Sequence, residues 1–507
     1  MRCTGSRSRP ENAAPARAPR PRTAGAPDVP PLEAALAPLR GRLLAARERR
    51  EARIHELAPM PSDDCLVVVG VSLPGADKNL CGADALVALA LGELAAGAKR
   101  SRRLPVGRGL EPLGPWAALR LPGPPARAKA LCVGVEERHS WGRLLDLDVY
   151  HRDGDGALRQ LGRTGLGLAA RACLVCGEPA RECILLGRHS EAELSRRTQE
   201  LLAAAAAGLR LRRLADALVR GARAELDLTP KPGLVDRRDQ GSHPDLSYRL
   251  MRRSVELLAD YHRDLLGILE RAGWTAARGP SSGATSDVAP GPDRALDEAT
   301  WRSCLAAGRA AEARMFEAVG ANAHRGYIFL SGLVLLAAAE VAATDADRLR
   351  PAIARLAARF FAGSPASARG LAADRPGERL RRAGGVGGIE AEARAGLPAV
   401  FEAALPALGR HGGAFRAMAA LMRRLEDTTT LHRGGRPGLE RIREDGARLE
   451  AMLERGEDPR THLARWNDEY RAVGLTMGGV ADCLALAIAL AEPATAAAGS
   501  ARPRRRS

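Results

Sequence analysis

The 507-residue sequence predicts a multidomain protein, with an N-terminal α+β domain followed by a larger all-α domain. Two observations support this fold class. Short β-branched runs alternate with helical patterns up to residue 190, whereas helical Ala/Leu/Arg patterns fill the chain from residue 191 onward. The length suits two or three domains. We therefore expect domains at 32–200 and 205–492, between a disordered basic extension at 1–31 and a basic tail at 493–507.

The first domain is predicted to alternate helices with strands. A stripe of leucines opposite Arg and Glu predicts a helix at Leu32–Leu57, and a second helical pattern covers Asp84–Ala98. The Gly and Asp residues of His151–Gly156 favour a turn between strands. Short apolar runs predict strands at Cys65–Val69, Leu131–Val135 and Leu144–Tyr150.

The second domain is predicted to be helical throughout. A single long pattern covers Glu191–Leu226, and a loop rich in Gly, Ser and Pro occupies Gly279–Pro292. The remaining helical patterns lie at 246–272, 295–319, 327–342, 346–361, 396–425, 439–455, 460–473 and 479–491.

Charge and composition limit the function classes. The formal net charge is +17, of which residues 31–492 hold about +9 and the two extensions the rest. A positive body of this kind attracts nucleic acid, an anionic membrane or a polyanionic small ligand. Only 3% of residues are aromatic, which argues against a protein that binds single strands by base stacking.

The same composition predicts a location. No apolar run reaches the ~18–20 residues needed to cross a bilayer, and the first 31 residues hold no apolar segment typical of a secretory signal. The nine cysteines are scattered and odd in number, unlike a disulfide framework. We expect a cytoplasmic protein with no membrane and no nucleic acid as partner.

Asp146 and Asp148 are the first candidate chemical feature. In a strand, residues two apart point to the same face, so the two carboxylates would lie side by side. Mg²⁺ bound to substrate phosphates relieves their repulsion, which is the arrangement that nucleotidyl transfer needs. The alternative is an exposed strand face with two solvated acids.

A second feature is a set of candidate metal ligands in the pattern Cys-x2-Cys-x6-Cys-x5-His. A Cys-x2-Cys pair followed by Cys and His suits tetrahedral Zn²⁺, and Gly177 allows the turn that such a loop requires. The alternative is a loop with three reduced thiols and a surface histidine. The four residues are Cys173, Cys176, Cys183 and His189.

These features occur in an order that resembles the citrate lyase holo-acyl-carrier-protein synthase family over residues 32–200. The resemblance is carried by Leu73–Lys78, His139–Val149, Cys173–Cys183 and Arg188-His189. It implies transfer of a phosphoribosyl-dephospho-CoA unit to a serine of the apo acyl-carrier subunit of citrate lyase, with release of pyrophosphate.

The resemblance also implies roles for residues of the first domain. Asp146 and Asp148 are the carboxylates that act with Mg²⁺. Arg143 and Lys78 neutralise the charge of the triphosphate, and His139 is a candidate base.

The second domain contains segments suited to phosphate. Leu228–Asp236 holds two prolines and a glycine, so it forms a rigid turn that presents Lys231 as a point charge. Asn322–Gly326 places polar groups at the start of an apolar helix, where anions bind. The glycine run that includes Gly384 and Gly385 suits close approach to phosphates, and a plain linker explains it equally well.

Acidic residues of this domain are candidate ligands of Mg²⁺. Several lie at helix ends, where an Asp is commonly a cap. Asp482 lies in an otherwise apolar helix, where a charge needs a partner or a metal. The candidates are Asp236, Asp427, Asp468 and Asp482.

The order of these segments resembles the triphosphoribosyl-dephospho-CoA synthase family over residues 205–492. The resemblance implies that ATP is joined to 3′-dephospho-CoA through a ribosyl linkage and that adenine is expelled. The product of this domain would then be the substrate of the first. The matching segments are 230–236, 241–245, 322–326, 427–435, 467–470 and 478–482.

Several positions differ from the family pattern. Ala323, Thr429 and Val480 stand where the family usually has Thr, Asn and Ser. Glu390 stands where the family usually has Arg, which puts an acid where phosphate charge is expected. Arg381 and Arg382 are the expected substitutes for that Arg.

The reaction that the resemblance implies needs a base and several cations. The 2′-hydroxyl of dephospho-CoA attacks the ribose carbon that bears adenine, through a transition state of oxocarbenium character. His324, His243 or Glu392 would activate the hydroxyl. The expected substrate-binding residues are Lys231, His243, Asn322, Arg325, Gly384, Gly385, Arg433 and Asn467.

Other functions stay open at this point. Malonate decarboxylase uses the same prosthetic group, so the equivalent steps for that enzyme are one alternative. A basic, zinc-containing module that binds nucleic acid, or a scaffold without catalytic activity, is the alternative of a different class.

Overall fold

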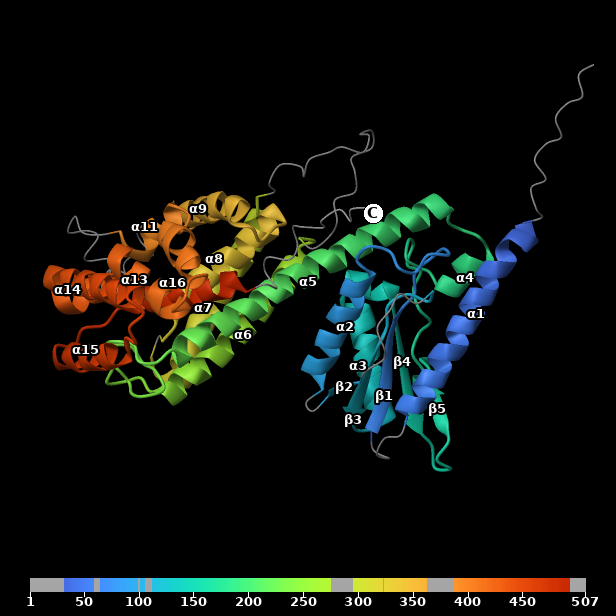
Figure 1. Cartoon of the computed structure of the whole chain (residues 1–507). Coiled ribbons are helices and arrows are strands. Elements are labelled where there is room, and N and C mark those ends of the chain that lie inside the picture. Colours follow the sequence, from blue (N-terminus) through green and yellow to red (C-terminus); the bar gives the residue numbers. More distant parts are fainter. Residues whose placement is uncertain are drawn as a thin grey trace, which may run out of the picture.

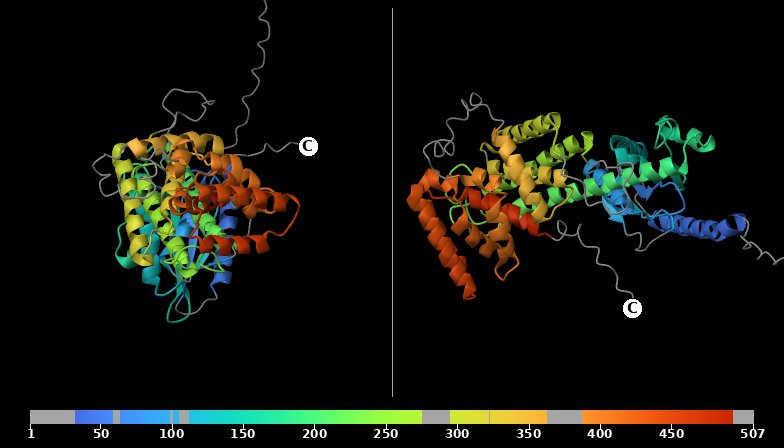
Figure 2. Two further views of the ribbon diagram at one scale, coloured as in Figure 1. Left: turned by 90° about the vertical axis from the view of Figure 1, so that its left-hand side faces the viewer. Right: turned by 90° about the horizontal axis from the view of Figure 1, so that it is seen from above.

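We describe the protein from a computed structural model that covers residues 32–58, 64–98, 101–104, 112–274, 295–321, 323–362 and 387–492. Figures 1 and 2 show two bodies joined by one long helix: a sheet covered by helices, and a larger helical bundle. The predicted order of an α+β domain and an all-α domain is confirmed. The extensions at 1–31 and 493–507 and the loop Gly279–Pro292 lie outside the described residues.

A five-stranded antiparallel sheet forms the first body, in the order β2-β3-β1-β4-β5. Val67 and Val69 of β1 meet one apolar cluster, and Leu66 and Val68 meet the other, so this central strand is buried on both faces. The strands are β1 (Asp64–Val71), β2 (Arg102–Leu104), β3 (Ala117–Pro122), β4 (Leu145–Arg152) and β5 (Leu158–Leu161).

Helices cover both faces of this sheet (Figure 1). Helices α2 (Ala83–Gly97) and α3 (Pro125–Arg138) pack on the face that carries Val67 and Val69. Helix α1 (Leu32–Leu57) packs on the opposite face through Ile54. The predicted helices at Leu32–Leu57 and Asp84–Ala98 are therefore confirmed to within a residue or two.

The strand predicted at Leu131–Val135 is wrong, because these residues belong to α3. Ala128, Cys132 and Val135 recur at helical spacing and bury one side of that helix against the sheet. An apolar run this short fits a buried helix as well as a strand, and periodicity does not separate the two. The predicted strands at Cys65–Val69 and Leu144–Tyr150 are confirmed as β1 and β4.

Three strands were not predicted from the sequence: β2, β3 and β5. Ala117–Pro122 contains Ala, Arg and Pro, which favour strands weakly, and its register with β1 holds it extended. The other two are short edge strands whose few residues carry no alternating pattern.

Helix α5 (Glu191–Asp227) links the two bodies. Its 37 residues correspond to about 55 Å of helix at 1.5 Å per residue. Ser190 begins the helix with a capping box to Glu193. Leu201 and Leu202 pack in the core of the sheet domain, whereas Leu218 packs in the core of the helical domain. Residues 200–205, between the two expected domains, thus lie inside one unbroken helix.

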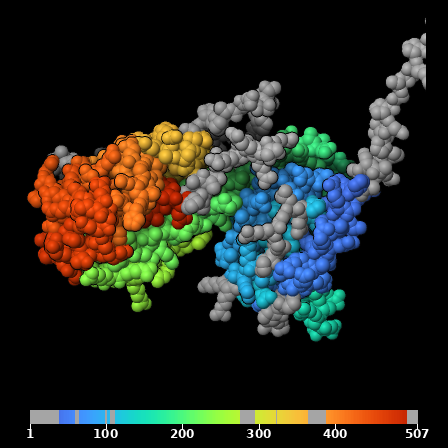
Figure 3. Space-filling model, viewed as in Figure 1, coloured from blue at the N-terminus to red at the C-terminus, as the bar shows by residue number. Residues whose placement is uncertain are grey.

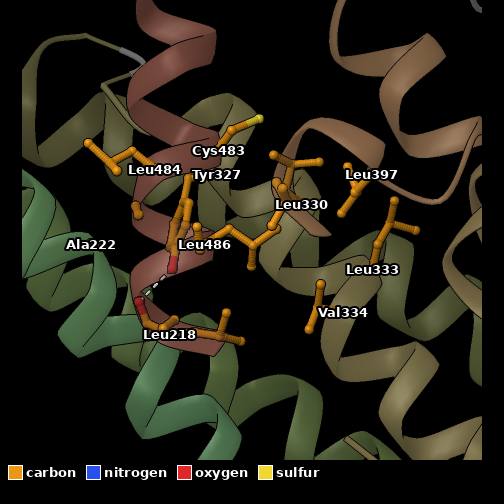
Figure 4. Packing of buried hydrophobic residues seen from close by; sticks show 14 of the residues in the cluster. Leu218, Ala222, Tyr327, Leu330, Leu333, Val334, Leu397, Cys483, Leu484 and Leu486 are labelled. Atoms are coloured by element: carbon orange, nitrogen blue, oxygen red, sulfur yellow. Dashed lines mark hydrogen bonds between the residues drawn. The ribbon is translucent and has the colours of Figure 1, made fainter. Parts of the chain in front are cut away.

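The helical domain is built around α16 (Gly478–Ala491), which packs on α5. The two helices approach closely at Gly221, where a Cβ atom would lie 2.3 Å from the carbonyl oxygen of Ala485. Figure 4 shows the core beside this contact, in which the Tyr327 hydroxyl donates a hydrogen bond of 2.6 Å to the carbonyl oxygen of Leu218. In the space-filling view the helical domain and the sheet domain remain distinct bodies (Figure 3).

The other described elements of this domain surround α16. They are α6 (Tyr248–Arg271), α7 (Glu298–Val319), α8 (Arg325–Val341), α9 (Ala346–Ala362), α11 (Gly388–Arg394), a π-helical turn η3 (Ala399–Ala404), α12 (Leu405–Leu408), α13 (Gly413–Arg424), α14 (Thr428–Glu454) and α15 (Arg460–Ala472).

The prediction of one helix over 396–425 is wrong, because the structure divides this stretch into η3, α12 and α13. Pro398 and Pro406 each remove a backbone donor, and Gly412 adopts a φ of 85° before α13 begins. The pattern at 439–455 instead extends back to Thr428, with a break at Gly435, where φ is 62°.

Within the described part of the chain, no single helix has both the length and the apolar character to cross a membrane. Helices α8 and α9 pass that test only as a pair, and they meet at a bend of 115°.

The two domains are also joined by a cluster of charges around His139. Its Nδ1 lies 2.6 Å from Oε1 of Glu270, at the end of α6, and its Nε2 lies 3.5 Å from Oε2 of Glu93, on α2. Arg138 and Arg212 also contact Glu93. Burial alone would lower the pKa of His139, but hydrogen bonds to Glu270 and Glu93 outweigh it and raise the pKa to about 9.

We predict that replacing His139 with Gln destabilises the protein at pH 7 by about 2–3 kcal/mol and has little effect at pH 10. The folded-state pKa lies above the unfolded value near 6.5, so the stabilisation is complete below pH 6.5 and is lost as the pH rises through about 9. The measurement is the difference in melting temperature between wild type and His139→Gln from pH 6 to pH 10. Exposed His462→Gln is the matched control, and a difference independent of pH would contradict the prediction.

Candidate functional site

A cavity of about 1460 Å³ opens in the helical domain. This exceeds the ≈ 300–1,000 Å³ typical of a site for one small molecule, so it offers room for two large substrates. Its walls come from the turn after α5, from α7, α8, α9 and α11, and from the first turns of α14 and α16. Six sequence-predicted residues line it: Lys231, His243, His324, Arg325, Arg433 and Asp482.

The turn after α5 holds Lys231 and His243 at the cavity. The turn is not helical, as predicted, and it contains a cis bond between Thr229 and Pro230. Asp236 accepts hydrogen bonds from the backbone N–H groups of Lys231 (2.9 Å) and Arg238 (2.7 Å). Asp236 therefore shapes this loop from within and does not line the cavity among the described residues.

Asn467 braces the same turn from α15. Its Oδ1 accepts a hydrogen bond of 2.9 Å from the N–H of Gly233, and its Nδ2 donates one of 2.9 Å to Asp239. Gly233 has a φ of 68°, and a Cβ there would lie 2.3 Å from the carbonyl oxygen of Leu475. Only glycine fits this position, because the turn is pressed against the chain before α16.

Lys231 is fully buried, with 1% of its surface exposed, and its ammonium group pairs with Glu225 of α5. The ammonium also donates a hydrogen bond of 2.7 Å to the carbonyl oxygen of Glu225. Burial raises the pKa of Glu225, whereas the lysine opposes that rise. Sequence reasoning missed Glu225; its signal is an acid in the buried, otherwise apolar last turn of α5.

Asp482 is buried at the start of α8 as well as on α16. The N–H of Tyr327 donates to it, and Gly326 lies so close that a Cβ would be 2.1 Å from its Oδ2. Burial raises its pKa well above the usual value, and the charges of Glu225 and Asp427 raise it further. Three carboxylates in mutual electrostatic contact therefore share this region with the single ammonium of Lys231.

Asp427 caps one helix and holds the start of another. Its Oδ1 accepts hydrogen bonds from the N–H groups of Thr429 (2.8 Å) and Thr430 (3.2 Å) at the start of α14. Its Oδ2 accepts a bond of 3.1 Å from Val480 in α16. Asp427 thus joins the two helix starts that form one wall of the cavity, and burial raises its pKa.

His324 is a neutral histidine with a defined tautomer. The Ser254 hydroxyl donates its proton to the carbonyl oxygen of Met251 at 2.8 Å, so at 2.6 Å it accepts a proton from Nδ1 of His324. Nε2 is then the nitrogen that carries a lone pair. Burial, with the charge of Lys231, lowers the pKa of His324 to about 4. The ring is therefore unprotonated at neutral pH, as a general base must be.

His243 and Arg433 lie on the opposite side of the turn. His243 shares a hydrogen bond of 3.1 Å with the Thr476 hydroxyl, and burial lowers its pKa. Arg433 donates to the carbonyl oxygen of Ser242 at 2.8 Å. Arg325, at the start of α8, lies 3.4 Å from Glu312. All three predicted side chains thus reach the cavity from different elements.

Glu390 also lines the cavity, and it pairs with Arg394 one turn later in α11 at 3.0 Å. Arg394 lies in the cavity wall too, with its guanidinium 5.1 Å from the ring centre of Phe361. A cation therefore accompanies the acid that replaces the usual Arg. The expected substitutes, Arg381 and Arg382, lie outside the described residues.

Aromatic side chains gather on one wall despite their scarcity in the chain. Phe329, Phe360 and Phe361 form a cluster with ring centres 4.9–5.5 Å apart. Trp301 lies under the guanidinium of Arg359 at 4.8 Å. A flat apolar wall of this kind suits a purine ring.

Two other predicted residues stand away from the described cavity lining. Asp468 is exposed and lies 3.9 Å from Arg471. Glu392 accepts a hydrogen bond of 3.0 Å from the N–H of Ala399, and burial raises its pKa. Asn322, Gly384 and Gly385 lie outside the described residues.

The sheet domain carries a second candidate site on β4. Asp146 and Asp148 are half-buried and alternate with the buried Leu145, Leu147 and Val149, so the two carboxylates share one face as predicted. Burial and then the charge of Asp146 raise the pKa of Asp148. Their mutual repulsion is therefore expressed in the folded chain.

Cations surround these carboxylates. Arg171 lies 3.2 Å from Oδ1 of Asp146. Lys78 bonds the carbonyl oxygen of Leu73 in the loop after β1, and burial lowers its pKa. Arg143 donates to the carbonyl oxygen of Cys173 at 2.9 Å. His139, the candidate base of this domain, is engaged instead by the two glutamates between the domains.

The four candidate metal ligands come together next to this site. Their ligand atoms all lie within 4.8 Å of one another: Sγ of Cys173, Cys176 and Cys183, and a ring nitrogen of His189.

Two family models match the chain. The model of the ATP:dephospho-CoA triphosphoribosyl transferases matches residues 211–498, and the model of the apo-citrate lyase phosphoribosyl-dephospho-CoA transferases matches residues 40–205.

Curated relatives are similar to one part of the chain or to most of it. A probable 2-(5''-triphosphoribosyl)-3'-dephosphocoenzyme-A synthase of Pseudomonas aeruginosa is 36% identical over 292 residues, which are 55% of this chain and 89% of that protein. Protein CitXG of Haemophilus influenzae is 28% identical over 468 residues, or 88% of this chain and 94% of that protein. Protein CitXG of Leuconostoc mesenteroides is 28% identical over 383 residues, or 72% and 77%.

We predict that Lys231→Met destabilises the helical domain by about 3–5 kcal/mol, because it leaves the buried Glu225 carboxylate unpaired. The double variant Lys231→Met/Glu225→Gln should recover part of this loss. The measurement is urea unfolding followed by circular dichroism. Arg263→Met is the control, since its pair with Asp260 is exposed and should contribute no more than about 1 kcal/mol. A double variant less stable than the single one would contradict the prediction.

Proposed function

The chain belongs to the family of ATP:dephospho-CoA triphosphoribosyl transferases, and from this premise we propose which residues carry out its two transfer reactions. It is a bifunctional transferase of citrate lyase prosthetic-group synthesis, because a domain of each family is present and fusion relatives span most of the chain. Its substrates include ATP and dephospho-CoA, and its target is an acyl-carrier protein.

The helical domain forms 2′-(5″-triphosphoribosyl)-3′-dephospho-CoA. The 2′-hydroxyl oxygen of 3′-dephospho-CoA bonds to the ribose carbon C1′ of ATP, while the bond from that carbon to adenine breaks. The hydroxyl loses a proton and the departing adenine gains one. The observation that carries this assignment is the neutral His324, with its Nε2 lone pair, in the same cavity as Lys231, Arg325, Arg433 and Asp482.

His324 is the base in this proposal. Its Nε2 takes the proton of the 2′-hydroxyl as the oxygen bonds to C1′. Ser254 fixes the ring through Nδ1, which keeps the lone pair on the nitrogen needed for the reaction. His243 is the second candidate, since it also lines the cavity as a largely neutral ring.

Cations of the cavity hold the triphosphate. Lys231 acts from the floor of the turn, and Arg325, Arg394 and Arg433 act from the walls. Arg394 replaces the guanidinium that the family usually has where this chain has Glu390. The aromatic wall of Phe329, Phe360, Phe361 and Trp301 receives the adenine ring.

Mg²⁺ fits the carboxylates of this cavity. Glu225 and Asp482 have raised pKa values and only Lys231 to balance them, and hard oxygen ligands are what Mg²⁺ prefers. When bound there, the ion would neutralise the phosphate oxygens. Asp427 supports these residues by fixing the starts of α14 and α16.

The sheet domain attaches the product to its carrier. The serine oxygen of the carrier attacks the α-phosphorus, forming a phosphodiester and releasing pyrophosphate. Asp146 and Asp148 are the residues that would hold Mg²⁺, which would neutralise the leaving pyrophosphate. Arg171 and Lys78 supply further positive charge. The Zn²⁺ expected at the cysteine cluster would bind apart from these carboxylates.

The carrier in this proposal is the apo γ subunit of citrate lyase. Malonate decarboxylase remains the alternative source of the carrier, and labelling of one apo subunit in preference to the other separates them. We also propose a cytoplasmic location, where the free thiols found among the described residues stay reduced.

We predict that His324→Gln lowers adenine release by a factor of 10²–10⁴ with wild-type stability. Wild-type protein with ATP, Mg²⁺ and 3′-dephospho-CoA should release free adenine, measured by liquid chromatography. The base form of His324 persists down to about pH 4, so the rate should not fall between pH 8 and pH 6 on account of this group. His462→Gln is the control on an exposed histidine. Absence of adenine in the wild type would refute the synthase assignment.

We predict that Asp146→Asn abolishes transfer to the carrier while adenine release continues. The substitution removes one charge from the pair but keeps the shape of a side chain that is half-exposed on β4. The measurement is the mass of the carrier subunit after incubation with the product of the helical domain. Asp155→Asn, in the exposed turn between β4 and β5, is the control. Undiminished labelling by Asp146→Asn would show that this carboxylate holds no metal.

A further inference from the structure

The segment from Gly162 to Ser190 folds almost without an apolar core. Of its side chains, only those of Cys173 and Cys183 are buried. Its larger apolar residues face outward: Leu185, for example, is 75% exposed, and Ile184 is 79% exposed. A loop of this size with so little buried apolar surface needs another source of stability, such as a disulfide or a metal ion.

The buried thiols of this segment meet the other two candidate ligands. Sγ of Cys176 lies 3.4 Å from Sγ of Cys183 and 3.3 Å from Nε2 of His189. Four ligand atoms around a tetrahedral Zn²⁺, at about 2.3 Å for sulfur and 2.0–2.1 Å for nitrogen, lie roughly 3.3–3.8 Å from one another. The observed separations already match that spacing.

The backbone around Cys173 and Cys176 has the form of a metal-binding turn. The N–H of Val175 points at Sγ of Cys173 at 3.5 Å. The N–H of Cys173 donates to the carbonyl oxygen of Glu178 at 2.6 Å, and Gly177 reverses the chain with a φ of 80°. N–H groups directed at sulfur stabilise a thiolate, which is the form that binds a metal.

We propose that Cys173, Cys176, Cys183 and His189 bind one structural Zn²⁺. Three thiolates and one imidazole form a closed tetrahedral set of the kind that holds zinc without an open position for substrate. The thiols are all free, so no disulfide takes the place of the ion. The ion thus supplies the stability that the exposed leucines of this segment do not.

The zinc loop is fastened to the transferase site by two arginines, and this second part rests on the proposed function. Arg143 donates to the carbonyl oxygen of the ligand Cys173. Arg171, two residues before that ligand, donates to the carbonyl oxygen of Leu145 at 2.9 Å and to Glu136 at 2.6 Å, and it contacts Asp146. The ion therefore positions Arg171 and Arg143 beside the carboxylates of β4 and touches no substrate itself.

The direct test is the metal content of the full-length protein, purified under reducing conditions without added metal and measured by plasma mass spectrometry. We expect one zinc per chain. Titration of the wild type with an organomercurial should release that zinc as the thiols react. Growth with cobalt should give the visible and near-ultraviolet absorption of tetrahedral Co²⁺ bound to thiolates.

Variants locate the ion. Cys176→Ser and His189→Ala should lose the zinc, whereas His189→Cys should retain it because a fourth thiolate completes the set. Cys81→Ser is the matched control, since Cys81 is an exposed free thiol outside the segment. Adenine release serves as the folding control, because the helical domain contributes no ligand.

The outcomes separate the two parts of the proposal. Wild-type protein without zinc, or Cys176→Ser with as much zinc as the wild type, overturns the metal site whatever the activity. Zinc lost together with at least a tenfold drop in carrier labelling, while adenine release continues, supports both parts. Zinc lost with carrier labelling unchanged keeps the ion but overturns its positioning of Arg143 and Arg171.

Discussion

The structure depends on the continuity of α5. One helix supplies Leu201 and Leu202 to the core of the sheet domain and Leu218 to the core of the helical domain, so neither core is complete without it. Its close contacts are backbone contacts: Gly221 admits α16, and Gly82 meets the carbonyl oxygen of Leu202. A break in this helix would therefore disturb both domains, unlike a break in a flexible linker.

The same helix carries the charge on which the cavity is organised. Glu225 lies in its last turn, and the chain then turns sharply so that Lys231 pairs with it in the interior. Taking both charges out of water is costly, and the pair is tolerated because the backbone carbonyl of Glu225 also accepts from the ammonium. The cost is typical of a functional site, because charges held away from water act more strongly on a bound phosphate.

Several sequence predictions succeeded because they depend on local spacing. Asp146 and Asp148 share a face of β4 since alternation is a property of any strand. The Cys-x2-Cys pair and the following Cys and His converge because short loops bring near neighbours together. The strand predicted at Leu131–Val135 failed because an apolar run of that length does not distinguish a helix from a strand, and only packing on the sheet decides.

The sequence by itself determined the order of the two domains, the local motifs and the residue types that suit phosphate and metal. Only the tertiary structure separated the residues that line the cavity, such as His324 and Asp482, from those that hold the loops behind it, such as Asp236 and Asn467. It also placed His139 between Glu93 and Glu270, and Arg394 beside Glu390. Local spacing fixes which way a side chain points along its own element. Its partner across more than a hundred residues is set by how the helices pack.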